Sequence, residues 1–369
     1  MDVQYSKRLE KIEGRLSSVL PRFPDASWMN AAFTGRARGA GADLAQSLTG
    51  PGWDMVSRGG KRWRPLLLTL ICEALGGGDA AFSLVPLVEL PHNASLIHDD
   101  IEDNSDERRG KPASHILFGT DTAINSGCFL YFLPLVCIDS WDAVLELKNK
   151  AYAVWGEHMR RLHLGQAMDI YWHRHFEALP SPEEYALMCR LKTGALARLA
   201  AVLGVYTGIA CRDGVCPAEE LLREKTEALA DLVGEAAEKL GVGFQILDDV
   251  KNLSAGIPGK KRGDDIVEGK KSLPALLFMR QNPGKLPLVA RCFKAAREGG
   301  AGVPEVAELI GEFEKAGVLE QAKTEGLTLI AEAQEVLTAI GGDTGGPNEP
   351  AGKTHEARRL LAGFSALIS

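Results

Sequence analysis

Apolar residues recur at helical spacing along almost the whole chain. The spacing is clear in LLLTLICEAL at 66–75, EYALMCRLKTGALARLAAVLGVY at 184–206 and ALADLVGEAAEKLGVGFQILDDV at 228–250. Such spacing places an apolar stripe along one face of a helix, whereas a half-buried strand needs strict alternation, which is scarce here. The pattern predicts an all-α fold.

Clusters of Gly and Pro interrupt this pattern and predict the breaks between helices. None is long enough for a clear linker between domains, and no repeat of fixed period is present. We therefore expect residues 1–369 to form a single large helical domain, with a mobile loop at 341–353 before a final short helix. The predicted breaks are LTGPGW at 48–53, LGGGDA at 75–80, ALPSPEE at 178–184, 254–265, 281–287 and 340–353.

Charge and cysteine usage exclude some classes of function. The net charge is −7 and the pI about 5.7, which argues against nucleic acid as the main partner because phosphate binding needs a basic surface. The seven Cys are odd in number and scattered, as expected of free thiols in a reducing compartment. Cys211 and Cys216 have no second pair nearby, so we expect no zinc site there.

No segment of the sequence predicts secretion or a membrane span. The charged, amphipathic N-terminal stretch lacks the apolar region of a signal peptide. The longest apolar run, CFLYFLPLVCI at 128–138, contains Pro134 and is shorter than the roughly 20 residues that a spanning helix needs. We interpret this run as a buried helix and expect a cytoplasmic protein with no transmembrane segment.

Carboxylates are concentrated in DDIEDNSDERRG at 99–110, directly after an apolar segment. If this stretch is helical, Asp99, Asp103 and Asp106 lie within roughly 60° of one another around the helix. Like charges at this spacing repel, and a hard divalent cation with oxygen ligands removes the repulsion. A solvated acidic face is the alternative interpretation. The apolar segment favours a core-packed helix and hence a metal site.

A second acidic pair, Asp248 and Asp249, follows a similar apolar lead-in, GVGFQILDDVKN. Basic residues come after both acidic clusters: Arg108, Arg109, Lys260, Lys261, Arg262, Lys270, Lys271. Mg²⁺ that keeps several waters binds through a few carboxylates and substrate phosphates, and Arg and Lys hold the phosphates. The combination predicts a diphosphate site with a metal bridge, beside an apolar pocket for a hydrocarbon tail.

Five motifs in order resemble the trans-isoprenyl diphosphate synthases of the polyprenyl synthetase family. The resemblance extends over about residues 59–274 and implies a helical bundle around a central cavity. The motifs are GGKRWRP at 59–65, SLIHDDIEDNSDERRGKP at 95–112, GQAMDIYW at 165–172, KTGAL at 192–196, and FQILDDVKN at 244–252 with GDDIVEGKKSLP at 263–274.

The resemblance implies that the chain joins isopentenyl diphosphate to an allylic diphosphate with the help of Mg²⁺, three ions in each site, and that it is a homodimer. Asp99, Asp100 and Asp103 would hold two ions, and Asp248 a third with support from Asp249. The residues implied to contact the allylic diphosphate are Arg108, Lys192, Lys261. Those implied to bind isopentenyl diphosphate are Lys61, Arg64, His92, Arg109. Those implied to line the site are Thr193, Gln245, Lys270.

Three residues depart from the family pattern, and one of them is Cys128, which stands where relatives often carry a polar residue. Asn252 replaces the usual third Asp of the second acidic region; its amide is a weaker ligand that can still orient a metal-bound water. Pro91 precedes His92 and is expected to kink the helix or to remove one of its hydrogen bonds.

Product length should depend on residues one helical turn before Asp99. These are Ala94 and Ser95, whose small size favours a product of about twenty carbons, the geranylgeranyl size, or longer. The next barrier is expected from the neighbouring helix, from Tyr131, Phe132, Phe129.

Two other functions stay open at this stage. A terpene cyclase would ionise an allylic diphosphate in the same way but would lack the set implied for isopentenyl diphosphate. A non-catalytic partner subunit would lack acidic ligands.

The histidines at 163, 173 and 175, around the GQAMDIYW motif, are interpreted as structural. Gln166 and Asp169 are interpreted as residues that support the cavity.

Overall fold

The computed structural model describes residues 3–37, 39–211, 224–256, 261–340 and 352–368. Over these residues the chain is helical apart from turns and one two-stranded ribbon, in which β1 (Glu107–Arg108) pairs antiparallel with β2 (Lys111–Pro112). The all-α prediction is confirmed.

The helices follow one another with short connections. From the N-terminus to the middle of the chain they are α1 (Val3–Val19), α2 (Ala26–Ala32), α3 (Ala42–Ser57), α4 (Trp63–Ala74), η1 (Ala80–Leu84), α5 (Pro86–Glu102), α6 (Ser114–Phe118), α7 (Thr120–Phe132), η2 (Leu133–Leu135), α8 (Val136–Asp139) and α9 (Leu145–Arg174). Then come α10 (Pro182–Cys189), η3 (Arg190–Gly194), α11 (Ala195–Ala210), α13 (Glu224–Ser254), α14 (Asp264–Glu268), α15 (Leu273–Gln281), η5 (Pro283–Lys285), α16 (Leu286–Gly299), α17 (Pro304–Lys315), α18 (Val318–Ala339), α19 (Lys353–Ala362) and α20 (Phe364–Ile368).

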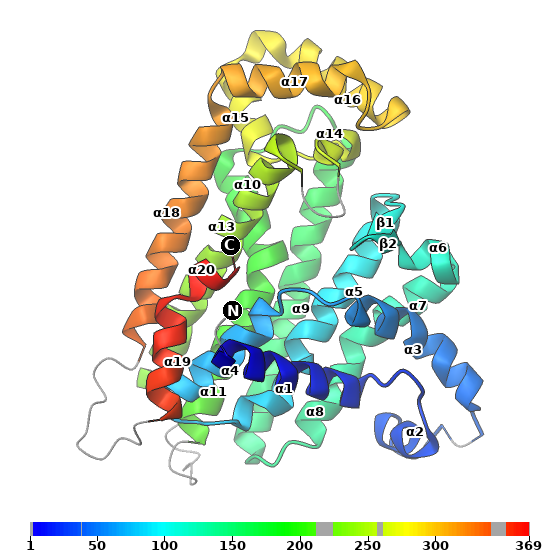
Figure 1. Cartoon of the computed structure of the whole chain (residues 1–369), viewed down its shortest axis with the longest axis vertical. Coiled ribbons are helices and arrows are strands. Elements are labelled where there is room, and N and C mark those ends of the chain that lie inside the picture. The colour runs from blue at the N-terminus through cyan, green and yellow to red at the C-terminus, as the bar shows by residue number, and fades with distance from the viewer. Residues whose placement is uncertain (1–2, 38, 212–223, 257–260, 341–351, 369) are drawn as a thin grey trace.

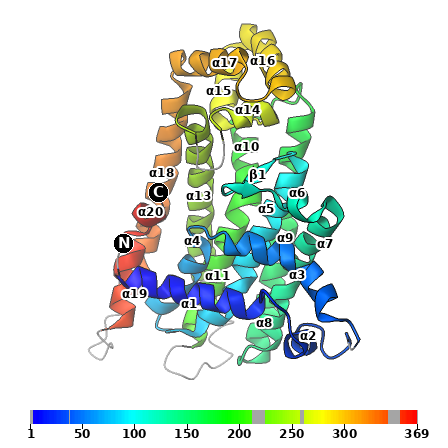
Figure 2. The ribbon, with the colours of Figure 1, turned by 45° about the vertical axis from the view of Figure 1, so that its right-hand side comes forward.

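Long helices form the body of the molecule. Helices α9, α13 and α18 run along its long axis, and α16 and α17 lie across one end (Figure 1). Helix α13 packs along α18 and α11, and α11 packs on α4. Helix α1 crosses the body near the other end, in front of α4 (Figure 2). The buried side chains of α13 belong to both of two hydrophobic clusters, so this helix connects them.

Helix α9 passes unusually close to the turn that carries the KTGAL motif. A Cβ at Gly165 would lie 2.3 Å from the backbone nitrogen of Lys192, so only glycine allows the approach. The chain at η3 (Arg190–Gly194) winds as a π-helical turn, a distortion that often marks a functional position. This contact fixes Lys192 and Thr193 between α9 and α13.

Two predicted local structures are wrong. The break predicted at LTGPGW does not occur, because α3 continues through Pro51 and packs on α7. There Gly52 lies against Leu130 and donates to Ser126 Oγ at 3.1 Å. The apolar run at 128–138 is not one buried helix: α7 ends at Phe132, and η2 with Pro134 separates it from α8.

Two stretches of the described chain are long and apolar enough to cross a membrane by length and composition alone. They are Thr120–Asp139 and Pro182–Ala210, of which 50% and 83% are buried inside the fold. The second is a core helix by that measure. Cys216 and residues 341–351 of the predicted loop lie outside the described residues, and a short helix, α19, follows as expected.

Candidate functional site

Helix α5 carries both the first acidic region and His92. It is continuous from Pro86 to Glu102, so Pro91 does not interrupt the helix, and as expected this residue has no N–H to donate. The helix ends with Asp103 as its C-cap, and Asn104 follows with a φ of 53°. Asp106 therefore leaves the helical face that was predicted to carry it, because the chain turns away three residues earlier.

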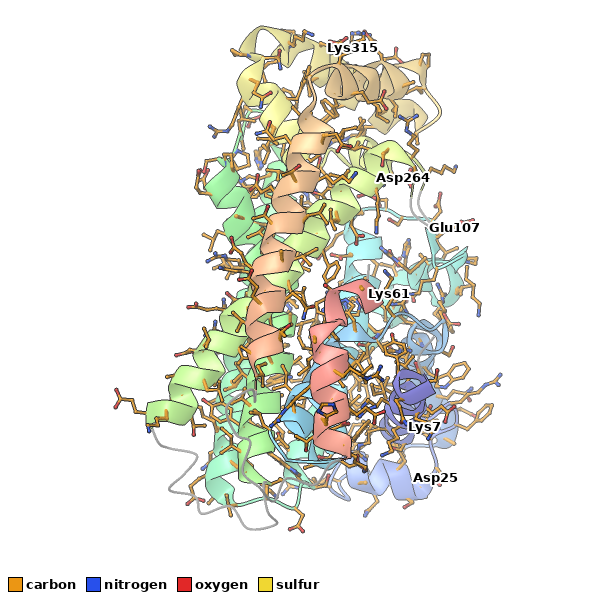
Figure 3. All side chains as sticks on the ribbon, turned by 60° about the vertical axis from the view of Figure 1, so that its left-hand side comes forward. Lys7, Asp25, Lys61, Glu107, Asp264 and Lys315 are labelled. Carbon is orange, nitrogen blue, oxygen red and sulfur yellow. The ribbon has the colours of Figure 1, made fainter. Side chains whose placement is uncertain are left out.

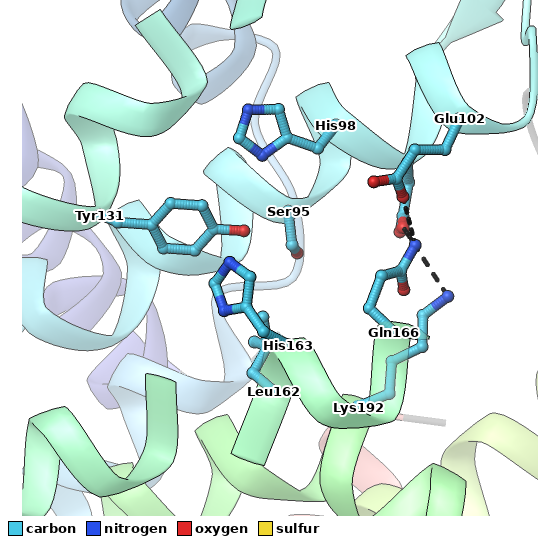
Figure 4. Close-up of a pocket in the computed structure, with 9 residues that line it drawn as sticks. Ser95, His98, Glu102, Tyr131, Leu162, His163, Gln166 and Lys192 are labelled. Atoms are coloured by element: carbon cyan, nitrogen blue, oxygen red, sulfur yellow. Dashed lines mark hydrogen bonds and ion pairs between the residues drawn. The ribbon is translucent and has the colours of Figure 1, made fainter. Parts of the chain in front are cut away.

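Asp99 contacts Gln166 on α9 and lies close to Lys192 in the π-helical turn; these two residues are labelled in Figure 4. Gln166 Nε2 donates to Asp99 Oδ1 at 2.6 Å and to Glu102 Oε2 at 2.5 Å, and Lys192 Nζ lies 3.7 Å from Asp99 Oδ1. Burial, with smaller contributions from Asp99 and Asp103, raises the pKa of Glu102. Glu102 belongs to this site, although it was not among the site residues predicted from the motifs.

Asp169 on α9 holds Lys192 in place. Lys192 Nζ donates to Asp169 Oδ2 at 2.6 Å, and His173 Nε2 lies 2.7 Å from Asp169 Oδ1. Burial alone would raise the pKa of Asp169, but Lys192 and His173 lower it well below its usual range. His173 also lies 4.0 Å from Asp103, so it borders the site.

Asp100 and Arg108 form a buried pair. Arg108 Nε donates to Asp100 Oδ1 at 2.8 Å, and the Asp100 side chain is fully buried. Burial raises the pKa of Asp100 in spite of Arg108.

The hairpin formed by β1 and β2 accounts for the Arg-Arg-Gly sequence. Arg109 and Gly110 connect the two strands and have φ of 52° and 72°, the geometry of a tight two-residue turn.

The second acidic region lies at the end of α13. Both carboxylate oxygens of Asp249 are occupied, by Tyr185 Oη at 2.7 Å and by Gln245 Nε2 at 3.0 Å. Thr193 Oγ1 donates to Gln245 Oε1 at 2.9 Å, so the π-helical turn is tied to Asp249. Burial first, and Asp265 second, raise the pKa of Asp249 to about 7. Asp248, in contrast, is exposed.

Lys270 connects the two acidic regions. Its Nζ lies 3.4 Å from Asp103 Oδ2 and 3.9 Å from Asp265 Oδ1, and it pairs with Glu268. The next residue, Lys271, donates to the backbone oxygen of Trp172 at 2.9 Å, at the C-terminal end of α9. The segment after the second region is therefore anchored beside the first.

Asn252 and Lys261 both contact the start of α14. Asn252 is 1% exposed, and its Oδ1 accepts the backbone N–H of Asp265 at 3.2 Å, so this oxygen holds the first turn of α14. The side chain of Lys261 is exposed, while its backbone N–H donates to Asp264 Oδ2 at 2.6 Å. Lys61, Glu107 and Asp264 lie one above another along the right-hand side of Figure 3.

A second group of basic side chains lies near the middle of α5. We call it the cationic cluster, and its members are Lys61, Arg64, His92, Arg109. Arg109 Nη1 donates to the backbone oxygens of Gly59 and Met55, the latter at 3.3 Å, and lies 3.4 Å from Asn93 Oδ1. Burial and the neighbouring Arg64 and Arg109 keep the pKa of His92 well below its usual value, so the ring is neutral.

Arg64 is the least satisfied member of this cluster. Its Nε atom is buried without a hydrogen-bond partner among the described residues, and its guanidinium lies 4.4 Å from the ring centre of Trp63. Burial lowers the pKa of Arg64 to about 10, although Glu89 and Asp248 oppose the shift. Lys61 is exposed at the edge of the same loop.

A pocket opens beside Asp99 between α5, α7 and α9. The lining residues are Ser95, His98, Asp99, Glu102, Tyr131, Leu162, His163, Gln166, Lys192. Figure 4 shows Tyr131 facing Ser95 across this pocket. Phe132 is 63% exposed, and neither it nor Phe129 lines the pocket, so of the three predicted barrier residues only Tyr131 is in place. His98 and His163 line it unexpectedly.

The carboxylates suit a divalent cation without forming a ready-made cage. Within the described ranges, no three His, Cys, Asp or Glu side chains are grouped as a metal site. Mg²⁺ usually takes one or two carboxylates and completes its shell with waters and substrate phosphates, so no such cage is needed. Asp99 and Asp103 now face the ammonium groups of Lys192 and Lys270, positions in which a cation is already favoured.

Comparisons with known proteins agree with this geometry. The polyprenyl synthetase family matches residues 45–310. Geranylgeranyl pyrophosphate synthase of Neocamarosporium betae is 34% identical over 294 residues, which are 79% of this chain and 77% of that protein. Variediene synthase of Emericella variicolor is 33% identical over 72% of this chain, which spans only 35% of that protein's length.

The fold agrees as well. The crystal structure of geranylgeranyl pyrophosphate synthetase from Pyrococcus horikoshii Ot3 superposes with a TM-score of 0.77 at 26% identity, covering 99% of this chain and 96% of that one. Geranylgeranyl pyrophosphate synthases are prenyltransferases, in agreement with the predicted enzyme class. The chain belongs to the polyprenyl synthetase family.

Proposed function

We propose that this chain condenses isopentenyl diphosphate with an allylic diphosphate to give a longer trans-polyprenyl diphosphate. One observation carries the proposal: a single helix, α5, presents His92 to a cationic cluster in its middle and Asp99, Asp100 and Asp103 at its end. Two diphosphate sites of different character are thus held about two helical turns apart, and two diphosphate substrates need such a pair.

The acidic end is the proposed allylic site. Asp99 and Asp103 from α5 and Asp248 from α13 would hold Mg²⁺, and we keep the family's three ions as the proposed number. Bound metal would draw charge from the leaving diphosphate. Asp249 acts through its partners, since Tyr185 and Gln245 occupy both of its carboxylate oxygens. Arg108 occupies only Oδ1 of Asp100, and Oδ2 has no hydrogen-bond partner among the described residues, so Asp100 is proposed as a further metal ligand.

Basic groups of the chain complete the allylic site. Lys192 and Lys270 lie close to Asp99 and Asp103, and Arg108 is anchored beside them. They position the allylic diphosphate and stabilise the charge that develops on it as the C–O bond breaks. Lys261 is proposed as a further contact, with Thr193 and Gln245 holding the π-helical turn.

The cationic cluster is the proposed isopentenyl diphosphate site, with Lys61, Arg64, His92 and Arg109 as ligands. Arg64 has a buried, unpaired Nε–H group to offer, and a phosphate oxygen would satisfy it. Because His92 is neutral, it adds a hydrogen bond without adding charge to an already cationic cluster.

Product length is proposed to be geranylgeranyl size or longer. Ala94 is buried and Ser95 lines the pocket, so neither blocks a chain that extends past Asp99. Tyr131 is the first bulky side chain that the chain would meet.

We further propose a homodimeric, cytoplasmic enzyme folded as one domain. Large apolar side chains stay exposed on neighbouring α6 and α7, as expected of an interface. They are Ile116, Leu117, Phe118, Ile124, Phe132.

The test is a product assay. Purified chain is given Mg²⁺, isopentenyl diphosphate and farnesyl diphosphate, and the products are dephosphorylated and separated by length. We expect release of diphosphate and a product of twenty or more carbons. Consumption of the allylic substrate without isopentenyl diphosphate would instead indicate a cyclase, and no turnover would indicate a partner subunit.

A further inference from the structure

The turn that joins α3 to α4 has a demanding backbone. Gly59 and Gly60 have positive φ, and so does Arg62, at 48°, the N-cap of α4. A side chain in this left-handed region is strained unless its surroundings hold it there. Lys61 and Arg64, two of the proposed isopentenyl diphosphate ligands, flank this arginine, so their directions depend on it.

Each nitrogen of the Arg62 guanidinium already has a partner within the chain. Nε donates to Glu13 Oε1 at 2.7 Å, Nη1 to Glu89 Oε1 at 2.7 Å and Nη2 to the backbone oxygen of Val56 at 2.5 Å. Its side chain is 1% exposed. This arginine therefore holds the turn, whereas Arg64 in the same motif has an unpaired Nε.

One of these partners comes from outside the family match. Glu13 lies on α1 (Val3–Val19), whereas the match begins at residue 45. Helix α1 contacts the turn a second time through Tyr5, whose hydroxyl donates to the backbone oxygen of Lys61 at 3.4 Å. Glu89 alone does not neutralise the positive charge of Arg62, because the Glu89 carboxylate also interacts with the guanidinium groups of Arg64 and Arg109.

We propose that Glu13 is a positioning residue for isopentenyl diphosphate binding, acting through Arg62 on the directions of Lys61 and Arg64. The N-terminal helix is then part of the site rather than an appendage to the family fold. This inference rests on the proposed function of the cationic cluster.

The test compares Glu13→Gln with Glu10→Gln, a control at an exposed position of the same helix. Kinetics with both substrates, calorimetric titration with isopentenyl diphosphate and thermal unfolding are measured on the whole chain. Glu13→Gln should raise the KM for isopentenyl diphosphate roughly threefold to tenfold and weaken its binding equally, with the KM for farnesyl diphosphate changed less than about twofold. Glu10→Gln should match the parent.

A double-mutant cycle with Arg62→Gln identifies the route. If Glu13 acts through Arg62, adding Glu13→Gln to Arg62→Gln changes the KM little further. Provided that the parent makes product, three results would each overturn the inference. Glu13→Gln could raise the KM for isopentenyl diphosphate and the KM for farnesyl diphosphate equally, or it could change neither. The effects of Glu13→Gln and Arg62→Gln on the KM for isopentenyl diphosphate could also be additive. If the parent neither binds isopentenyl diphosphate nor makes product, the proposed function fails first and the inference falls with it.

Discussion

The two charged ends of the site are balanced in different ways. At the acidic end of α5, Asp99, Asp100 and Asp103 each face a cationic or amide group of the chain: Gln166 and Lys192, Arg108, and Lys270. In the cationic cluster, Glu89 is shared by several guanidinium groups, and Arg64 keeps a buried Nε without a partner among the described residues.

The difference indicates what each half needs from its substrate. The acidic half is already neutralised by lysines that metal and diphosphate would share or displace. In the cationic half the Nε–H group of Arg64 is buried without a partner among the described residues, which costs free energy until a phosphate arrives. Binding at the two halves should therefore respond differently to the same kind of substitution.

The largest effect is expected where the acidic half meets the metal. Asp99→Asn should lower kcat/KM for the allylic substrate by at least about 10³-fold, because it removes a carboxylate that would stabilise the leaving group through the metal. Steady-state rates at saturating Mg²⁺ measure this. Asp106→Asn is the matched control, since Asp106 is exposed beyond the end of α5. Equal damage from both substitutions would contradict the assignment.

A paired substitution in one motif tests the cationic half. Arg64→Met should raise the KM for isopentenyl diphosphate about 10²-fold and yet stabilise the substrate-free chain by about 1 kcal/mol, because a buried Nε–H group without a hydrogen-bond partner is removed. Arg62→Met should destabilise the chain by about 3 kcal/mol, because Glu13 and Glu89 lose their partner. Urea unfolding and kinetics read both effects. The same sign of stability change in both variants would refute the comparison.

Much of this arrangement was predictable from local pattern. Helical spacing predicts the fold class. The family resemblance implied Asp99 and Lys192 as site residues, and Asp99 Oδ1 lies 3.7 Å from Lys192 Nζ. Contacts made by the fold were not predictable. The π-helical turn at Lys192 depends on the close approach of Gly165, and the partner of Arg62 lies 49 positions earlier in the chain.

Local signals failed where packing overrides them. The break predicted at Pro51 does not occur, because α3 continues through this residue and packs on α7. Asn252 was interpreted from its place in the motif, but its side chain is buried and holds α14. At this position, where Asn replaces the usual Asp, the contact in the structure is with the backbone of α14. Sequence spacing does not predict this contact.

His92 gives the cationic half a pH signature. Its folded pKa lies below the value of about 6.5 expected in the unfolded chain, so the unfolded state takes up a proton that the folded state does not. Stability contributed by neutral His92 is present above about pH 6.5 and lost as the pH falls. Relative to His92→Gln, the parent should lose up to about 1.4 kcal/mol per pH unit below that point.

Urea unfolding of the substrate-free chain between about pH 5 and 7.5 measures the difference. His355→Gln is the control, because His355 is exposed on α19. A constant difference between the parent and His92→Gln across this range would mean that the cationic cluster does not hold the ring neutral.

The smallest effect is expected at the pocket beside the acidic half. Tyr131→Ala should lengthen the products by about one or two five-carbon units with little change in rate, because Tyr131 is the bulky side chain that faces Ser95 across the pocket. Phe132→Ala, one residue along the same helix, should leave product length unchanged, since Phe132 is exposed and outside the lining. Chromatography of the dephosphorylated products distinguishes the two. If Phe132→Ala lengthens the products and Tyr131→Ala does not, the growing chain takes another path, and the pocket beside Asp99 is not the place where its tail lies.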